Sequence, residues 1–260
     1  MILDKLAEAT LRRVQKHKES LPFTELRSMA ENMEITDAFP FERALKKEGI
    51  SFICEVKKAS PSKGLIAPDF PYLKIAHEYE EAGAAAISCL TETDYFLGSD
   101  EYLKQIAEAV KIPVLRKDFT IDEYMIFEAK VLGASAVLLI CTLLEQERLK
   151  YYLEIAHSLG LSALVEAHDE AEMESALNSG AGIIGVNNRN LKDFTVDINT
   201  AVRLRKLAPE SVTFVAESGI KTSDDVARLY KNNCDAVLIG ETLMRSRDKR
   251  GMLDELKRYC

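Results

Sequence analysis

The sequence predicts an α/β fold, a single (β/α)8 TIM barrel with an N-terminal helical extension. From residue 51 onward, eight short runs rich in Val, Ile and Leu alternate with longer amphipathic segments. A length of 260 residues suits one such barrel, and no Pro-rich or Gly/Ser-rich linker divides the chain. We therefore expect residues 1–260 to form one domain, with residues 1–48 as its extension. An open, doubly wound sheet of eight strands would give much the same periodicity and is the alternative.

The expected strands are the short apolar runs, which cover residues 51–56, 85–90, 113–116, 135–141, 161–166, 182–186, 212–217 and 235–239. The segments between them have helical periodicity and are long enough to connect parallel strands. These helices cover residues 71–82, 100–110, 122–132, 144–158, 169–179, 197–207 and 222–231. Asp69, Asp122 and the run that begins at Thr222 are expected to cap helix N-termini.

Composition and charge exclude several classes of protein. The formal net charge of -8 argues against a surface that neutralises nucleic-acid phosphates. The N-terminal stretch is charged and amphipathic, unlike a signal peptide, and no run of about 18 apolar residues could span a membrane, so we expect a cytoplasmic protein. The five cysteines form no C-x-x-C pair and the four histidines show no ligand spacing, so we expect reduced thiols and no metal site.

Ionisable and amide residues stand where the expected strands end, and in a barrel these ends form one rim that carries the active site. Glu55 and Lys57 are two residues apart on one strand, so both side chains should point into the barrel mouth while Val56 points outward. A structural ion pair is the alternative for this pair alone. Burying charges at five strand ends for structure alone would be costly, which favours catalysis. The candidate catalytic residues are Glu55, Lys57, Lys117, Glu166, Asn187 and Glu217.

The loops after the last two strands suggest a phosphate site, because such loops bind phosphate through backbone N–H groups in many barrels. Ser218 and Gly219 follow the seventh strand, and Gly240 and Glu241 follow the eighth, although either pair could also form an ordinary tight turn. The polar loop 58–64 suits a mobile cover over a substrate, or is a plain surface loop. Tyr95, Phe96 and Phe119 could form an apolar wall for an aromatic ring, or belong to the core.

The same strand ends carry segments that resemble the indole-3-glycerol-phosphate synthase family. In the family's order, the matching segments are EVKKASPSKG (55–64), LTETDYFLGS (90–99), LRKDF (115–119), LVE (164–166), GVNNRNL (185–191), VAESGI (215–220) and LIGETLM (238–244). They occur at the family's spacing over nearly the whole chain, and the N-terminal extension is similar too. The departures, Ala167 and Thr120, fall beside the key residues, so an active enzyme is expected.

The resemblance implies a carboxy-lyase of tryptophan biosynthesis that needs no cofactor or metal. Its substrate would be 1-(2-carboxyphenylamino)-1-deoxyribulose 5-phosphate, which is cyclised, decarboxylated and dehydrated to indole-3-glycerol phosphate. By analogy, Lys117 is the general acid of ring closure, and Glu166 relays protons and steadies the cationic intermediate. Glu55 and Lys57 resemble a second acid–base pair used in dehydration, although the sequence does not settle which lysine acts in which step.

The resemblance also implies how the substrate is bound. Asn187 and Glu217 would position the catalytic groups and bind substrate hydroxyls. The residues expected near the substrate's anionic ends are Arg189 and Ser60, with Ser218, Gly219, Gly240 and Glu241 around the phosphate, the last through its backbone N–H only. The expected neighbours of the anthranilate ring are Phe96, Phe119, Leu90 and Leu138.

Two alternative functions stay open on the sequence. One is another phosphate-binding barrel such as phosphoribosylanthranilate isomerase, which would be expected to use a Cys and an Asp as its acid–base pair. Cys54 should face the helices, which disfavours that enzyme. The other is a catalytically silent barrel subunit, which would have lost an ionisable strand end. The expected partner is a small phosphorylated molecule, with no nucleic acid or membrane, and the chain is expected to be a monomer or a weak homo-oligomer.

Overall fold

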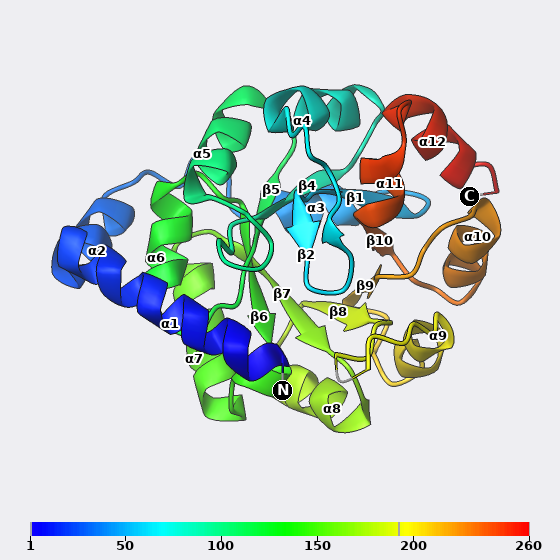
Figure 1. The fold of residues 1–260 in the computed structure, drawn as a ribbon. Coiled ribbons are helices and arrows are strands. Elements are labelled where there is room, and N and C mark those ends of the chain that lie inside the picture. Colours follow the sequence, from blue (N-terminus) through cyan, green and yellow to red (C-terminus); the bar gives the residue numbers. More distant parts are fainter. Residues whose placement is uncertain (1, 192, 260) are drawn as a thin grey trace.

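Eight parallel strands close into a barrel in the computed structural model, which describes residues 2–191 and 193–259 (Figure 1). Each strand pairs with its neighbour along the sequence, and the last strand pairs with the first, which excludes an open sheet. The barrel strands are β1 (Ser51–Val56), β4 (Ala86–Leu90), β5 (Val114–Lys117), β6 (Ala136–Ile140), β7 (Ser162–Ala167), β8 (Ile183–Asn187), β9 (Thr213–Glu217) and β10 (Ala236–Ile239). Every expected strand is confirmed to within one residue at each end.

Helices connect the strands and cover the outside of the barrel. They are α4 (Tyr72–Glu81), α5 (Asp100–Ala109), α6 (Tyr124–Val131), α7 (Gln146–Ser158), α8 (Glu170–Asn178), α9 (Asn199–Arg205), α10 (Ser223–Lys231), the short α11 (Glu241–Arg245) and α12 (Lys249–Leu256), with a 3-10 turn, η1 (Cys141–Leu143). The Thr222 cap is confirmed, since its side chain and that of Asp225 form a capping box. Asp122 accepts the N–H of Tyr124 at 2.9 Å. The Asp69 cap was wrong: Pro71 takes that position, and no described side chain caps α4.

Two apolar layers follow from the alternation of side chains along each strand. Cys54 and Val56 face outward and pack in the layer between strands and helices, as expected. The inward-facing residues fill the barrel itself, and they include Ile53, Leu115, Leu138, Leu164 and Val215. The catalytic candidates therefore stand on top of a packed interior, not inside a pore.

The N-terminal extension forms three helices that reach both ends of the barrel, namely α1 (Ile2–Ser20), α2 (Phe23–Glu31) and α3 (Pro40–Leu45). Phe41 and Leu45 of α3 are buried in the barrel interior and close its lower end, where the strands begin. Arg13 of α1 donates to the carbonyl of Thr91 and the carboxylate of Asp118, beyond the strands' C-terminal ends. Figure 1 shows α1 in dark blue, passing beside α6.

The loop after β1 contains a small hairpin, β2 (Ala59–Ser60) paired with β3 (Gly64–Leu65), where the sequence predicted only a loop.

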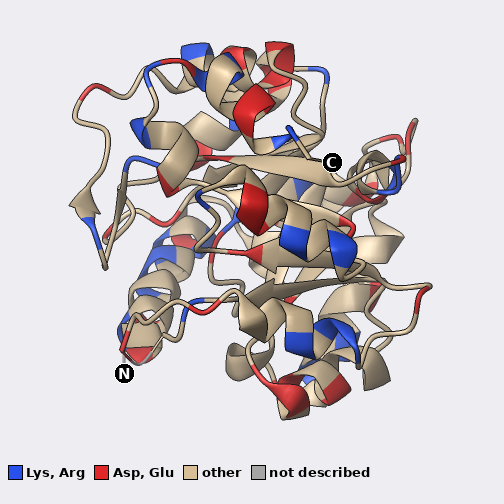
Figure 2. Cartoon of the chain, turned by 90° about the vertical axis from the view of Figure 1, so that its right-hand side faces the viewer, with Lys and Arg blue, Asp and Glu red and all other residues tan. Residues whose placement is uncertain are grey.

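On the side drawn in Figure 2, Lys and Arg alternate with Asp and Glu along the helices instead of gathering on one basic face. Within the described ranges, no helix has the length and apolar character needed to cross a membrane. Cys54, Cys89, Cys141 and Cys234 are free thiols, and Cys260 lies outside the described residues.

Candidate active site

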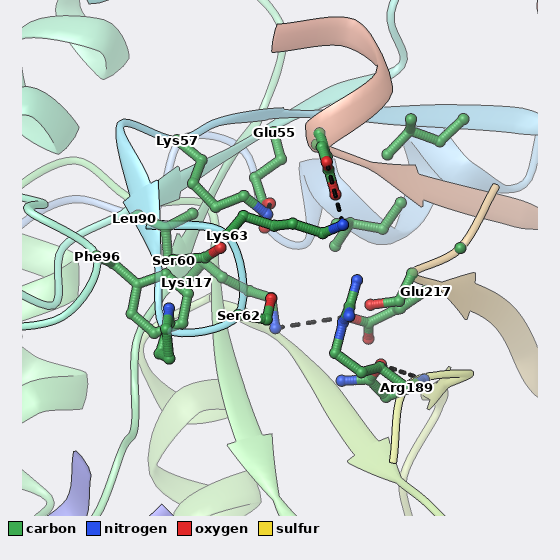
Figure 3. A pocket seen from close by; sticks show the side chains of 18 of the residues that line it. Glu55, Lys57, Ser60, Ser62, Lys63, Leu90, Phe96, Lys117, Arg189 and Glu217 are labelled. Atoms are coloured by element: carbon green, nitrogen blue, oxygen red, sulfur yellow. Dashed lines mark hydrogen bonds and ion pairs between the residues drawn. The ribbon is translucent and has the colours of Figure 1, made fainter. Parts of the chain in front are cut away.

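The C-terminal ends of the barrel strands surround a cavity of about 470 Å³. Tyr95, a candidate for the apolar wall, does not line this cavity, but every other residue that the sequence predicted for catalysis or substrate binding does. They are Glu55, Lys57, Ser60, Phe96, Lys117, Phe119, Glu166, Asn187, Arg189, Glu217, Ser218, Gly219, Gly240 and Glu241. Figure 3 shows Glu55, Lys57, Lys117 and Glu217 reaching into the same space from different strands. Residues remote in sequence thus meet because parallel strands end on one rim.

Lys117 occupies the centre of the charged cluster. Its Nζ lies 3.0 Å from Glu166 Oε2 and 3.4 Å from Glu217 Oε2, with only 15% of the side chain exposed. Burial alone would lower the pKa of Lys117, but the carboxylates of Glu166, Glu217 and Glu55 outweigh it and raise that pKa well above its usual value. Lys117 is therefore an ammonium group that carries a proton to donate.

The two carboxyl groups beside Lys117 differ in their affinity for protons. Burial opposes ionisation of Glu166, but Lys117 and His168 outweigh it and hold its pKa below the usual range. Burial raises the pKa of Glu217 to about 7, since Lys117 only partly offsets it and the charges of Glu166 and Glu55 add to it. Glu217 Oε1 is buried without a hydrogen-bond partner among the described residues. Two carboxyl groups with separated pKa values suit complementary roles as base and acid.

Glu55 and Lys57 form a second ion pair at the end of β1. Glu55 is buried, and Lys57 Nζ donates to its Oε1. Gly240 makes room for this pair, because a Cβ at that position would collide with the Glu55 carboxylate and approach Lys57 Nζ to 2.9 Å. The sequence reasoning assigned Gly240 to a phosphate loop alone and missed this steric role, which depends on the pairing of β10 with β1.

Asn187 and Arg189 stand at the end of β8. Asn187 Nδ2 lies 3.4 Å from Glu166 Oε1, and its Oδ1 accepts the backbone N–H of Arg189 at 3.0 Å. The Arg189 guanidinium donates to the carbonyl of Phe194 at 3.3 Å and lines the cavity (Figure 3). Asn187 thus contacts a catalytic candidate and fixes the backbone that carries a cation.

An apolar wall lies on the other side of the cavity. The rings of Phe96 and Phe119 are 6.0 Å apart, and Leu90 and Leu138 line the cavity with them. The buried carboxylate of Glu92 accepts the N–H groups of residues 94, 95 and 96, which fixes the loop that carries Phe96. The sequence reasoning did not identify this role of Glu92.

The loops after β9 and β10 form the remaining wall. Ser218 and Gly219 have φ values of 67° and 81°, so the chain turns here in the left-handed region. Glu241 points its carboxylate towards Lys63, at 3.6 Å, and Arg245, at 3.1 Å. Its side chain is thus engaged with cations at the edge of the cavity, and the sequence reasoning did not identify either cation.

Arg116 and Asp118 are ionisable residues of a strand end that serve the structure. The Arg116 guanidinium is buried on the outer side and lies 2.8 Å from Asp100 and 2.7 Å from Glu128. Arg116 faces away from the cavity because it alternates with Lys117 along β5. The carboxylates of Asp100 and Glu128 also lie near His17 in a geometry that could hold a metal ion, but both are already paired with Arg116, and Glu128 also with His17.

Two further features were not predicted from the sequence. Ile2 and Leu6 of α1 line the cavity, so the extension contributes directly to its wall. His168 Nε2 lies 3.2 Å from Glu166 Oε1. The position of His168 two residues beyond Glu166, directly after the end of β7, was the available signal for this contact.

Comparisons with known proteins agree with this geometry. The family model described as indole-3-glycerol phosphate synthase matches residues 3–256. Relatives of that name from Ruminiclostridium cellulolyticum and Endomicrobium trichonymphae are each 55% identical over 257 residues; the matches cover 99% of this chain and 99% and 100% of theirs. A solved 3-hexulose-6-phosphate synthase from Salmonella typhimurium, 14% identical, superposes with a TM-score of 0.66 over 81% of this chain and 98% of that one. This last likeness concerns the fold alone.

Proposed function

The chain belongs to the indole-3-glycerol phosphate synthase family, and on that premise we propose how its residues divide the reaction. The protein is a carboxy-lyase of tryptophan biosynthesis that acts on a small phosphorylated substrate. It converts 1-(2-carboxyphenylamino)-1-deoxyribulose 5-phosphate into indole-3-glycerol phosphate by ring closure, decarboxylation and dehydration. Family membership excludes the isomerase and the silent subunit as alternatives. The isomerase is also disfavoured because the thiol of Cys54 is buried in the layer between strands and helices.

The placement of Lys117 between Glu166 and Glu217 is the observation that supports the role assignment best. In ring closure, the Lys117 ammonium donates a proton to the substrate carbonyl oxygen as the aromatic carbon attacks the carbonyl carbon. The Glu166 carboxylate steadies the positive charge that this attack places on the ring system. Loss of carbon dioxide then leaves its bonding electrons with the ring.

Glu55 and Lys57, at the end of β1, catalyse the dehydration step. Lys57 protonates the departing hydroxyl group so that it leaves as water, and Glu55 accepts the proton that the ring system releases. The two side chains are already in contact in the free protein, which places the acid and the base of this step side by side. Glu217 and Asn187 position these groups and bind substrate hydroxyls.

The cavity wall divides into a polar side and an apolar side that match the two ends of the substrate. Arg189 and Ser60 would bind its anionic groups, and the phosphate would lie against the backbone of Ser218, Gly219, Gly240 and Glu241. The aromatic ring would lie on Phe96 and Phe119, beside Leu90 and Leu138.

We propose that the chain works as one domain, as a monomer or at most a weak homo-oligomer, and in the cytoplasm. Side chains from the N-terminal extension and from the barrel line one cavity, which supports a single domain.

The proposed function is tested by adding the carboxyphenylamino-deoxyribulose phosphate to purified protein and following indole fluorescence. Lys117→Ala and Glu166→Ala should each lower kcat by at least about 10²-fold with the circular dichroism spectrum unchanged. Lys111→Ala is the matched control, because Lys111 is an exposed residue before the opposite end of β5. No rise in fluorescence with folded wild-type protein would refute the functional assignment. Near-normal turnover in both variants would refute only the roles given to Lys117 and Glu166.

A further inference from the structure

His168 is a partly buried titratable group beside the active site, and it has no role in the mechanism proposed above. It follows β7 directly, and 17% of its side chain is exposed. Its Nε2 lies 3.2 Å from Glu166 Oε1, and its Nδ1 lies 2.9 Å from Glu172 Oε2 on α8. The imidazole therefore bridges a catalytic carboxylate and a second carboxylate outside the cavity.

Glu166 depends on this bridge for one of its two oxygens. Oε2 contacts Lys117 at 3.0 Å, whereas Oε1 contacts His168 at 3.2 Å and the amide of Asn187 at the longer distance of 3.4 Å. Without His168, the hydrogen bond from Asn187 would be the one remaining described contact of Oε1, and it carries no charge. A carboxylate with a cation at each oxygen is held more firmly against rotation away from Lys117 than one with a cation at a single oxygen.

The groups behind His168 are themselves held in place. Glu172 accepts the backbone N–H of His168 at 2.9 Å and also the hydroxyl of Thr142. The other charged groups that line the same neighbouring cavity of about 520 Å³ are Asp169 at the start of α8, Asp197, Arg189 and Arg203. Among the described residues, His168 lines that second cavity and is not part of the wall around the substrate cavity.

We propose that His168 is a positioning residue for the known reaction, which holds Glu166 aimed at Lys117 through the chain of contacts Glu172–His168–Glu166–Lys117. The proposal rests on the role given to Glu166 above. His168 acts through Glu166 and contacts neither the substrate nor the reacting atoms, so its loss affects turnover and leaves substrate binding intact.

The charge of His168 supports this role. Burial alone would lower the pKa of His168, but the contacts with Glu166 and Glu172 outweigh it and raise the pKa to about 10. At neutral pH the ring is then an imidazolium, whose Nδ1 donates to Glu172 and whose Nε2 lies within ion-pair distance of Glu166 without a hydrogen bond. Removing the Glu172 charge lowers that pKa, so the ring would lose its proton at a lower pH.

The first test compares His168→Gln and His168→Leu with the wild type by the fluorescence assay. We expect kcat to fall by about tenfold to a hundredfold, because the catalytic carboxylate is displaced, and KM to change by less than about threefold. The glutamine variant keeps a donor without the charge, so its loss should be the smaller. His157→Gln is the matched control, since His157 lies on α7 with its ring 5.5 Å from that of Phe39, and it should behave as the wild type.

The second test uses Glu172→Gln, which keeps His168 and its packing. On the alkaline side of the pH profile, kcat of Glu172→Gln should begin to decline at a lower pH than kcat of the wild type. The ¹⁵N shifts of the His168 ring in this variant should titrate over that same, lower pH range. A purely structural role would lower the melting temperature and leave kcat and its pH profile unchanged, which would overturn the proposal. Wild-type protein without turnover would instead defeat the proposed function.

Discussion

Replacing Gly185 with alanine tests whether the position of Glu217 controls the reaction. Gly185 lies on β8 beside β9, with a backbone conformation that alanine can adopt, so the change adds one methyl group and no backbone strain. A Cβ at this position would overlap Glu217 Oε1 and would also lie 3.1 Å from Leu164 Cδ1. The Glu217 carboxylate must therefore move away from β8.

The size of the effect follows from the contact that this movement breaks. Glu217 Oε2 lies 3.4 Å from Lys117 Nζ, so a retreat of about 1 Å takes the pair beyond the ~4 Å limit of a direct ion pair. Displacing a catalytic group by about 1 Å costs on the order of 10²-fold in rate. Crowding the barrel interior should also lower the free energy of unfolding by about 1–3 kcal/mol.

The measurement is kcat by indole fluorescence, together with urea unfolding of the same preparation. Gly182→Ala is the matched control, because Gly182 stands three residues earlier and a Cβ there would meet no described atom within 4 Å. We expect Gly182→Ala to keep wild-type turnover. Folded Gly185→Ala protein with kcat within about twofold of the wild type would refute the argument that this glycine sets the position of Glu217.

Two further predictions concern charge. Because burial raises the pKa of Glu217 to about 7 from an ordinary value of 4.5, the folded state favours its protonated form, so the free energy of unfolding should fall as pH rises through this range. Glu217→Gln should remove that decline and the inflection of kcat/KM near pH 7, and identical profiles for both proteins would contradict the assignment. Arg116→Met should lower the free energy of unfolding by about 3–5 kcal/mol, because it leaves the carboxylates of Asp100 and Glu128 without their buried partner. Urea unfolding measures this loss, and a change below about 1 kcal/mol would show that the cluster is dispensable.

The sequence by itself was enough to predict the order and limits of the barrel strands and which strand-end residues meet in the cavity. Apolar runs and amphipathic segments have local periods of two and 3.6 residues, which depend on neighbours in the sequence alone. The same two-residue period predicted that Cys54 faces outward and Glu55 inward, and the structure agrees. Since parallel strands of a barrel end on one rim, the strand order also brought Glu55, Lys117 and Glu217 to one cavity.

The tertiary structure alone decided what these groups do to one another. The pKa of Glu217 depends on how deeply it is buried and on the Lys117 Nζ at 3.4 Å, and both arise from strands far apart in the sequence. The steric roles of Gly185 and Gly240 likewise exist only because β9 and β1 lie beside them. Electrostatic and packing energies change steeply over about an ångström, whereas sequence patterns give the face of an element and not the distance to its neighbour.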